Sequence, residues 1–329
     1  MSAALLVRAL RDPACVAGLD AQAWNGLIAA ARAERLIATL AHRLDPAHVP
    51  SAVRPILTDA QNDAAREAQQ ALWEADRAAL ALAGLDVRMV LLKGTAYVAD
   101  ALAAGQGRFI GDLDILVPRS AIAAVEKALI ASGWEWVKED AYDDAYYRQW
   151  MHELPPMIHV ERDRMIDVHH TILPLTARQT PDAAAMIADA VPIANGLYIL
   201  SAEDRIVHSV AHMLADGDMQ GGLRNLWDIY CLLPDADPAA LTARAQRHGL
   251  ARPVAQARRL AAALYGDGAA LTLWDRLARA RLLARDGWGR ETRKALVFAF
   301  YVRSHWLRMP PLMLARHLWT KWRKGHRPQ

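Results

Sequence analysis

The sequence predicts an α+β protein in which a mixed β-sheet core, of α/β type, is flanked by helical regions at both ends. In residues 1–84, Ala, Leu, Arg, Glu and Gln dominate, and apolar residues recur at spacings of three and four. Short β-rich runs alternate with helical ones in residues 85–200. Helical periodicity returns in residues 201–329. We therefore expect an N-terminal helical region, a core and a C-terminal helical domain with these boundaries.

Helical periodicity in the N-terminal region falls into two stretches. Apolar residues follow a helical spacing over residues 27–44 and again over residues 53–82. Pro46 and Pro50 separate the two stretches, because proline lacks the amide hydrogen that a position inside a helix donates. We expect a helix in each stretch.

The core is expected to alternate strands with helices. Five β-rich runs predict strands, in the order VRMVLL, DLDILV, WEWV, MIHV and MIDVHH. Helices are expected over residues 97–104 and 121–132. Ser120 is suited to cap the start of the second helix, and Gly133 is suited to end it, since glycine readily adopts a left-handed conformation.

The composition excludes several classes of protein. Of the 329 residues, 53% are hydrophobic and 23% are charged, which excludes a disordered, collagen-like or disulfide-scaffolded chain. The net charge of +3 is too balanced to indicate a nucleic-acid binder. Cys15 and Cys231 match no metal-ligand spacing, and the longest uncharged apolar run, residues 295–302, is far shorter than the ~20 residues that cross a bilayer. With no signal-peptide pattern at the N-terminus, we expect a cytoplasmic protein without a membrane span.

The sharpest candidate for chemistry is the pair Asp112 and Asp114, which lie two residues apart in a strand-like run. Strand alternation puts both carboxylates on one face, roughly 6 to 7 Å apart, while Leu113 between them faces the core. Two ionised aspartates repel each other unless a cation lies between them, and hard oxygen ligands favour Mg²⁺ or Mn²⁺. The alternative is a half-exposed strand with a polar outer face.

A later strand, MIDVHH, carries a third carboxylate. Its alternation puts Asp167 and His169 on one face. If this strand lies beside the strand of Asp112, Asp167 completes a group of three carboxylates around two metal ions. Such a group can hold a triphosphate and stabilise leaving pyrophosphate. The alternative for Asp167 is an ordinary carboxylate on the surface of a strand.

A glycine turn precedes these aspartates. Residues 87–92 predict a buried strand, which runs into Lys93, Gly94 and Thr95 and then into a helix. Glycine lets backbone N–H groups at a helix N-terminus approach an anion closely, as in many phosphate sites, although the P-loop and Rossmann fingerprints are absent. Lys93 is a candidate to contact phosphate or the carboxylates, and the alternative is a lysine that reaches solvent.

The order of these residues resembles the nucleotidyltransferase superfamily, which has a DNA polymerase β-like core, and specifically an uncharacterised bacterial nucleotidyltransferase family. That family carries a Leu-Lys-Gly turn followed by an Arg-x-x-Asp-Ile-Asp-Leu-Leu-Val strand. Here these read LLKGTA at residues 91–96 and RFIGDLDILV at residues 108–117. Residues 167–169 are similar to its acidic-residue-then-His pattern, and His212 falls in a part that resembles its helical C-terminal portion. The resemblance spans roughly residues 85–235.

The resemblance implies roles for five residues. Gly94 and Thr95 would lie at the turn against the nucleotide phosphates. Asp112 and Asp114 would hold the metal ions. Asp167 would be a third ligand or the general base.

The implied activity is a nucleotidyltransferase reaction. A nucleoside monophosphate would pass from an NTP such as ATP to an acceptor hydroxyl or phosphate, with release of pyrophosphate and two Mg²⁺ or Mn²⁺ ions as cofactors. One alternative is an enzyme of the same fold that transfers AMP to a peptide or protein. Another is a non-catalytic nucleotide-binding module, which is supported by Gly94-Thr95 in place of the usual Gly-Ser or Gly-Gly turn and opposed by the retention of three carboxylates.

Arg108 is a further candidate for nucleotide binding. It follows the sequence Gly105-Gln106-Gly107, which we expect to form a flexible loop. A guanidinium that reaches the site would fork onto the β- or γ-phosphate oxygens. The alternative is a solvated loop arginine.

Several histidines are candidates for the acceptor site. His152 and His159 flank the Pro155-Pro156 break, and His169 shares a face with Asp167. His212 lies four residues after His208 on an expected helix, so the two share a face. We place His152, His169 and His212 in the acceptor site, and packing between helices remains the preferred interpretation of the His208 and His212 pair.

The C-terminus interleaves tryptophan with basic residues on an expected helix. The set is Trp306, Arg316, His317, Trp319, Lys321, Trp322, Arg323, Lys324 and Arg327. Aromatic area combined with positive charge suits an RNA, an anionic membrane surface or an acidic peptide as partner. The alternative is that the tryptophans pack on the helical domain and the charges are solvated.

Overall fold

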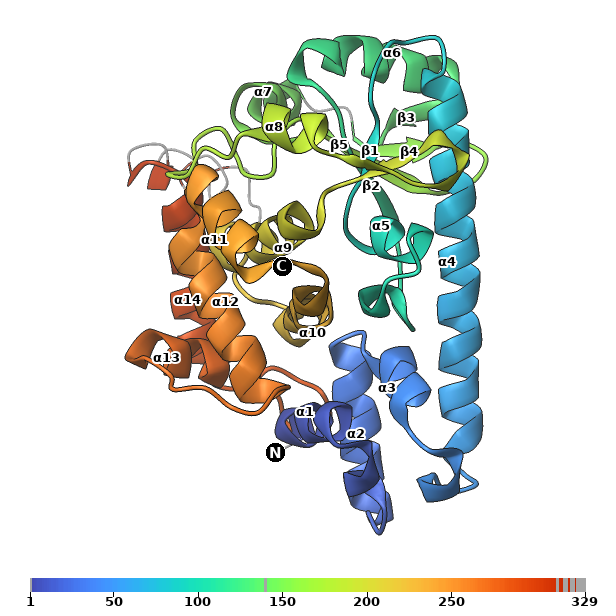
Figure 1. Ribbon diagram of the computed structural model, residues 1–329, viewed down its shortest axis with the longest axis vertical. Helices are drawn as coiled ribbons and strands as arrows, with labels where there is room; N and C mark the ends of the chain where they lie inside the picture. The colour runs from blue at the N-terminus through green and yellow to red at the C-terminus, as the bar shows by residue number, and fades with distance from the viewer. Residues whose placement is uncertain (1, 139–140, 312–313, 316–318, 320–322, 324–329) are drawn as a thin grey trace.

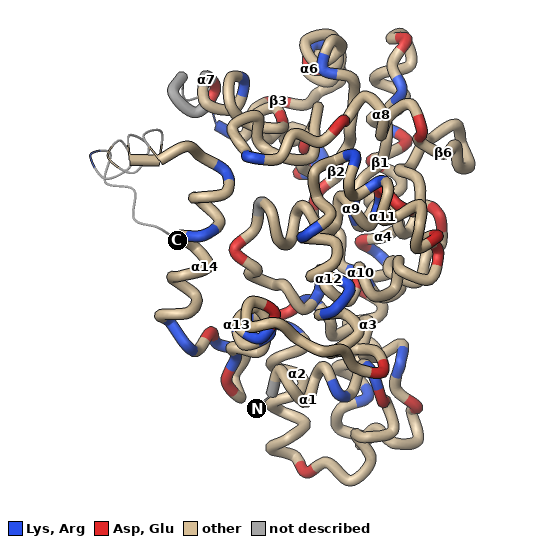
Figure 2. Tube along the Cα trace, turned by 60° about the vertical axis from the view of Figure 1, so that its left-hand side comes forward, with Lys and Arg blue, Asp and Glu red and all other residues tan. Residues whose placement is uncertain are grey.

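A computed structural model describes residues 2–138, 141–311, 314–315, 319 and 323. This part of the chain contains helices α1 to α14 and a seven-stranded mixed sheet, so the predicted α+β class is confirmed. In Figure 1 the sheet lies in the upper half, helices α1 to α3 lie at the bottom, and α11 to α14 lie at the left. Lys and Arg are interspersed with Asp and Glu along the elements, as the small net charge predicts (Figure 2).

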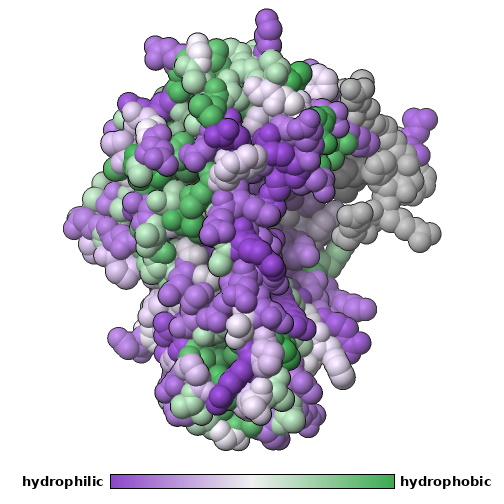
Figure 3. Space-filling model, turned by 90° about the vertical axis from the view of Figure 1, so that its right-hand side faces the viewer, coloured by the Kyte–Doolittle hydropathy of each residue, from purple (hydrophilic) through white to green (hydrophobic). Residues whose placement is uncertain are grey.

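The N-terminal region is helical, as expected. Its helices are α1 (Ser2–Arg11), α2 (Ala21–Ala33), α3 (Ile37–Arg43) and α4 (Arg54–Leu82). The long helix α4 reaches from the other N-terminal helices to the sheet (Figure 1), and it presents a hydrophilic band to the outside (Figure 3).

The expected single helix over residues 27–44 is wrong, because the chain turns between α2 and α3. Arg35 adopts a left-handed conformation with φ of 54°. The N–H of Leu36 then donates to the carbonyl of Ala31 at 2.7 Å, which is the hydrogen bond that closes a helix C-terminus after such a residue. Arginine here takes the position that glycine usually marks, so the sequence carries no signal for the break.

The sheet has the strand order β3-β4-β5-β2-β1-β7-β6. The strands are β1 (Val90–Leu91), β2 (Asp112–Leu116), β3 (Trp134–Trp136), β4 (Met157–His159), β5 (Met165–His169), β6 (Val191–Pro192) and β7 (Tyr198–Ile199). The central strand β2 pairs parallel with β5 and antiparallel with β1. Every predicted strand run is present, but β6 and β7 were not predicted.

Four helices accompany the sheet, namely α5 (Lys93–Ala99), α6 (Ile122–Ala131), α7 (Ala141–Trp150) and α8 (Ala183–Ala188). The helix expected from residue 97 therefore begins at Lys93. Ser120 as N-cap is wrong, since Ala121 holds that position without a side-chain cap. Gly133 follows α6 with φ of 95°, which is the left-handed conformation expected of it.

The C-terminal part is helical, as predicted. After α9 (Ala202–Val210) a π-helical segment, Ala211–Asp216, continues the same helix. Then follow α10 (Gly222–Leu232), α11 (Pro238–Arg247), α12 (Ala251–Leu264), α13 (Leu273–Leu282) and α14 (Lys294–Arg308). None of the helices in the described residues combines the length and apolar character needed to cross a membrane.

The tryptophan-rich C-terminus is only partly described. Trp306 on α14 and Trp319 are 45% and 59% exposed, so neither is packed away in the core. Trp322 and the predicted basic residues Arg316, His317, Lys321, Lys324 and Arg327 lie outside the described residues, together with that part of the partner prediction.

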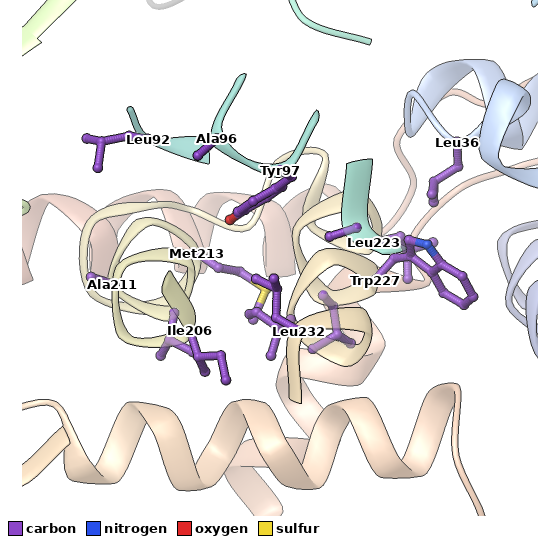
Figure 4. Close-up of a cluster of buried hydrophobic side chains, with 14 of the residues drawn as sticks. Leu36, Leu92, Ala96, Tyr97, Ile206, Ala211, Met213, Leu223, Trp227 and Leu232 are labelled. Atoms are coloured by element: carbon purple, nitrogen blue, oxygen red, sulfur yellow. The ribbon is translucent and has the colours of Figure 1, made fainter. Parts of the chain in front are cut away.

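The hydrophobic core is continuous through the three predicted regions. Figure 4 shows Tyr97 projecting from α5 toward Met213 of the C-terminal part. Buried polar groups also join the regions: Thr39 of α3 donates to the carbonyls of Gln106 and Gly107 at 3.1 Å each. The boundaries at residues 84 and 200 stay a prediction.

Candidate functional site

Three carboxylates meet on the two central strands of the sheet. Asp112 and Asp114 lie on β2, and the parallel register puts Asp167 of β5 directly opposite Asp114. One oxygen from each carboxylate lies within 4.8 Å of the others. Leu113 and Ile115, on the other face of β2, are 3% and 0% exposed, so burial of that face fixes the aspartates on this one. The strand juxtaposition on which the sequence hypothesis depended is therefore present.

Asp114 is the buried, charge-paired member of the group. Its Oδ1 accepts from Nζ of Lys93 at 2.7 Å and lies 3.0 Å from Nε2 of His169. Burial alone would raise the pKa of Asp114, but the charges of Lys93 and His169 hold this pKa well below its usual range. Burial likewise opposes the charged form of Lys93, and the Asp114 carboxylate nevertheless raises the pKa of Lys93 above its ordinary value. Asp114 is thus ionised throughout the physiological pH range.

Asp167 has the opposite environment. Burial, together with the negative charges of Asp114 and Glu153, raises its pKa to about 7. Its Oδ1 is buried without a hydrogen-bond partner among the described residues. Asp112, by contrast, is exposed. A group of hard carboxylate oxygens with an orphaned buried acceptor fits a divalent cation such as Mg²⁺ or Mn²⁺.

Mg²⁺ binding is expected to compete with the proton on Asp167. Because the ion requires the ionised carboxylate, its affinity should rise up to about tenfold per pH unit between about pH 5 and pH 7, and should then level off. Isothermal titration calorimetry of the chelator-treated protein across this range measures the slope. Asp167→Asn should bind Mg²⁺ more weakly and show a flatter profile, and an unchanged slope in that variant would contradict the assignment.

The glycine turn lies beside the carboxylates. The N–H of Leu92 donates to the carbonyl of Asp114 at 3.0 Å, which fixes the start of α5 against β2. A Cβ on Gly94 would lie 2.6 Å from Nε of Arg108, so the packing leaves no room for a side chain at this position. Thr95 is 1% exposed, and its hydroxyl has no hydrogen-bond partner among the described residues.

Arg108 packs against this turn, but its guanidinium is not free. It forms an ion pair with Asp228 of α10 and lies over the ring of Tyr97, 5.6 Å from the ring centroid. The preceding loop is not the flexible segment that the sequence suggested. Thr39 binds two of its carbonyls, and a Cβ on Gly107 would lie 2.5 Å from the backbone N of Thr39.

Two of the candidate histidines contact each other beside Asp114, and His208 and His212 lie within electrostatic range of them. His152 and His169 come together next to Asp114, with their rings stacked at a centroid distance of 5.2 Å. His159 instead packs its ring edge on Trp134, away from the carboxylates. His212 is exposed, and His208 is buried at 4% exposure. Neither of the last two belongs to a group of three potential metal ligands within the described part of the chain.

Glu153 was missed from the sequence. It lies in a loop, yet it forms an isolated antiparallel bridge with His169, and its carboxylate lies 3.3 Å from Nδ1 of that residue. Its place depends on how the chain returns across the end of β5, which no local pattern encodes.

Comparison with known protein families gives a match that includes the carboxylate site. A family model described as an uncharacterised nucleotidyltransferase matches residues 20–266. The match contains all three carboxylates and extends beyond the span of the resemblance seen in the sequence. No curated protein matches the chain.

Proposed function

The chain belongs to this family of uncharacterised nucleotidyltransferases, and on that premise we propose that it transfers a nucleoside monophosphate from an NTP to an acceptor hydroxyl or phosphate. Pyrophosphate is the second product. The observation that carries the proposal is the group of three carboxylates on two adjacent parallel strands, all within 4.8 Å of one another.

The metal requirement follows from the charge of the site. Asp112 and Asp114 are the residues that would hold the metal ions, with Asp167 as the third ligand. Two bound Mg²⁺ ions would neutralise the triphosphate and stabilise both the attacking and the leaving oxygen. The ionised state of Asp114, which Lys93 maintains, suits this role.

The alternative role that we propose for Asp167, in place of metal binding, is proton transfer. In the reaction, the acceptor O–H proton moves to a base, the acceptor oxygen forms a bond to the α-phosphorus, and the bond from that phosphorus to the β-phosphate oxygen breaks. A general base works best when its pKa lies near the working pH. The pKa of about 7 at Asp167 meets that condition only if Asp112 and Asp114 hold the metal ions without it.

The turn at Gly94 is assigned to the phosphates. Gly94 lies against the side chain of Arg108, and the buried hydroxyl of Thr95 has no hydrogen-bond partner among the described residues. Lys93 supplies positive charge beside them, although it contacts Asp114 in this structure. A role for Arg108 in binding phosphate requires its guanidinium to leave Asp228 or to be shared with it.

A nucleotide-binding experiment tests the proposal first. Thermal unfolding of the full chain is measured with each of the four NTPs, with and without Mg²⁺. A ligand at ~100 times its dissociation constant adds ~2.7 kcal/mol of stability. We expect a shift that requires both NTP and Mg²⁺, and no shift with any NTP would contradict the proposal.

Turnover is then measured as pyrophosphate release in the presence of fractionated bacterial extract. Mass spectrometry of the products separates the acceptors, because a nucleotide adduct on a protein cannot arise from a small-molecule acceptor. Binding without pyrophosphate release in any fraction would instead favour a non-catalytic nucleotide-binding module.

A further inference from the structure

A second group of potential metal ligands lies next to the carboxylates. It consists of His152, Glu153 and His169, each of which places one ligand atom within 4.8 Å of the other two. We propose that these three residues form a binding site for a zinc-class divalent transition metal, with a fourth coordination position left open. The proposal is independent of nucleotide transfer, since it concerns a different ligand set and a different metal.

The ligand type distinguishes this group from the three aspartates. Two imidazoles and one carboxylate favour Zn²⁺ and related transition metals, whereas an all-oxygen group favours Mg²⁺. Three protein ligands with an open position are typical of zinc sites that act on a bound water or substrate. Two metal ions of different chemistry would then lie on either side of His169.

Two of the three separations between ligand atoms are close to those of a bound ion, and the third is within 4.8 Å. Oε2 of Glu153 lies 3.3 Å from Nδ1 of His169 and 3.6 Å from Nε2 of His152. Zinc–ligand bonds of about 2.0 to 2.1 Å place the ligands of a tetrahedral ion about 3.3 to 3.4 Å apart. The two measured separations are close to this value.

His169 is oriented as a ligand. Its Nε2 lies 3.0 Å from Oδ1 of Asp114 and can donate a hydrogen bond there, which leaves Nδ1 as a lone-pair donor toward a metal. A histidine ligand that donates its other N–H to a carboxylate is the usual arrangement in metal sites. The side chain is only 4% exposed, yet its Nδ1 has no hydrogen-bond partner among the described residues. This buried nitrogen therefore points into the proposed site without a ligand.

The backbone holds the three ligands rigidly. The N–H groups of His170 and Leu154 donate to the carbonyls of His152 and Val168, both at 2.9 Å, across the bridge between Glu153 and His169. The ring of His152 stacks on that of His169 with an interplanar angle of 24°, so the His152 ring rotates for both in-plane lone pairs to reach one ion. The backbone contacts bring the three ligands together without ordering a loop.

The test measures Zn²⁺ binding to the full-length, chelator-treated protein in excess Mg²⁺, which occupies the oxygen-only group. Binding of about one Zn²⁺ per chain is expected. His152→Gln and Glu153→Gln should each weaken it by at least about 100-fold, because loss of a direct ligand exceeds the 10- to 100-fold effect of an outer partner. His48→Gln is the matched control, since His48 is exposed on a short turn.

A spectroscopic readout separates this site from the aspartates. Co²⁺ bound with nitrogen ligands in a tetrahedral site gives intense visible absorption bands, which should appear in the wild type and in Asp112→Asn and should be lost in Glu153→Gln. Circular dichroism checks that each variant is folded. If His152→Gln does not fold, the result for Glu153→Gln alone tests the proposal. Failure of the wild type to bind Zn²⁺, or loss of binding in Asp112→Asn alone, would overturn the proposal. His169 would then serve only as an ion-pair partner of Asp114 and Glu153.

Discussion

Asp112→Asn is expected to abolish nucleotide transfer while leaving the protein folded. The change removes one anionic ligand from the carboxylate group, and loss of such charge stabilisation should lower kcat by about 10³-fold or more. Asp112 is exposed, so the effect on the free energy of unfolding should stay within about 0.5 kcal/mol. Pyrophosphate release and thermal unfolding, measured on the same preparations, check the two halves of this prediction.

Asp112 is a cleaner test than Asp114. Substituting Asp114 would leave the ammonium of Lys93 and the ring of His169 without their partner, so lost activity could reflect damaged folding. Asp86→Asn is the matched control, because it makes the same change at an exposed position just before β1. Equal turnover in Asp112→Asn and Asp86→Asn would rule out a metal-binding role for Asp112.

The carboxylate group is the part of the site that the sequence predicts best. Alternation over a five-residue strand fixes which face Asp112 and Asp114 share, because the wrong register would expose Leu113 and Ile115. The pairing of that strand with the strand of Asp167 is a tertiary fact. From the sequence we could say only that the three carboxylates would meet if the two strands were neighbours. The structure shows that β2 and β5 are neighbours and pair in parallel.

Other features were out of reach because their causes are not local. Strands β6 and β7 are two residues each, too short to show alternation. Glu153 joins two histidines only through a backbone bridge to the end of β5. The sequence around Arg108 predicts only a loop arginine. Its ion pair with Asp228, 120 positions further along the chain, depends on the packing of α10.

That ion pair belongs to a buried network which joins all three predicted regions of the chain. Asp228, which is 2% exposed, pairs with Arg108 and accepts from Nη2 of Arg224 at 2.7 Å. Nη1 of Arg224 donates to the hydroxyl of Thr39 at 2.6 Å. One carboxylate therefore balances two guanidinium groups whose side chains are 14% and 6% exposed.

Asp228→Asn should consequently destabilise the protein far more than Asp112→Asn does. Among the described residues, Asp228 is the carboxylate that pairs with both arginines. Neutralising it leaves two largely shielded positive charges without compensation, and breaking such a group typically costs about 3 to 5 kcal/mol. Chemical denaturation measures the change, and Asp235→Asn, an exposed aspartate just beyond α10, is the control.

A second substitution, Arg108→Met, should recover part of the loss because it removes one uncompensated charge. A destabilisation below about 1 kcal/mol would mean that water or another group already satisfies the two arginines. In that case Arg108 would be available to a nucleotide phosphate at little cost, which ties the stability of this network to the chemistry proposed for the site.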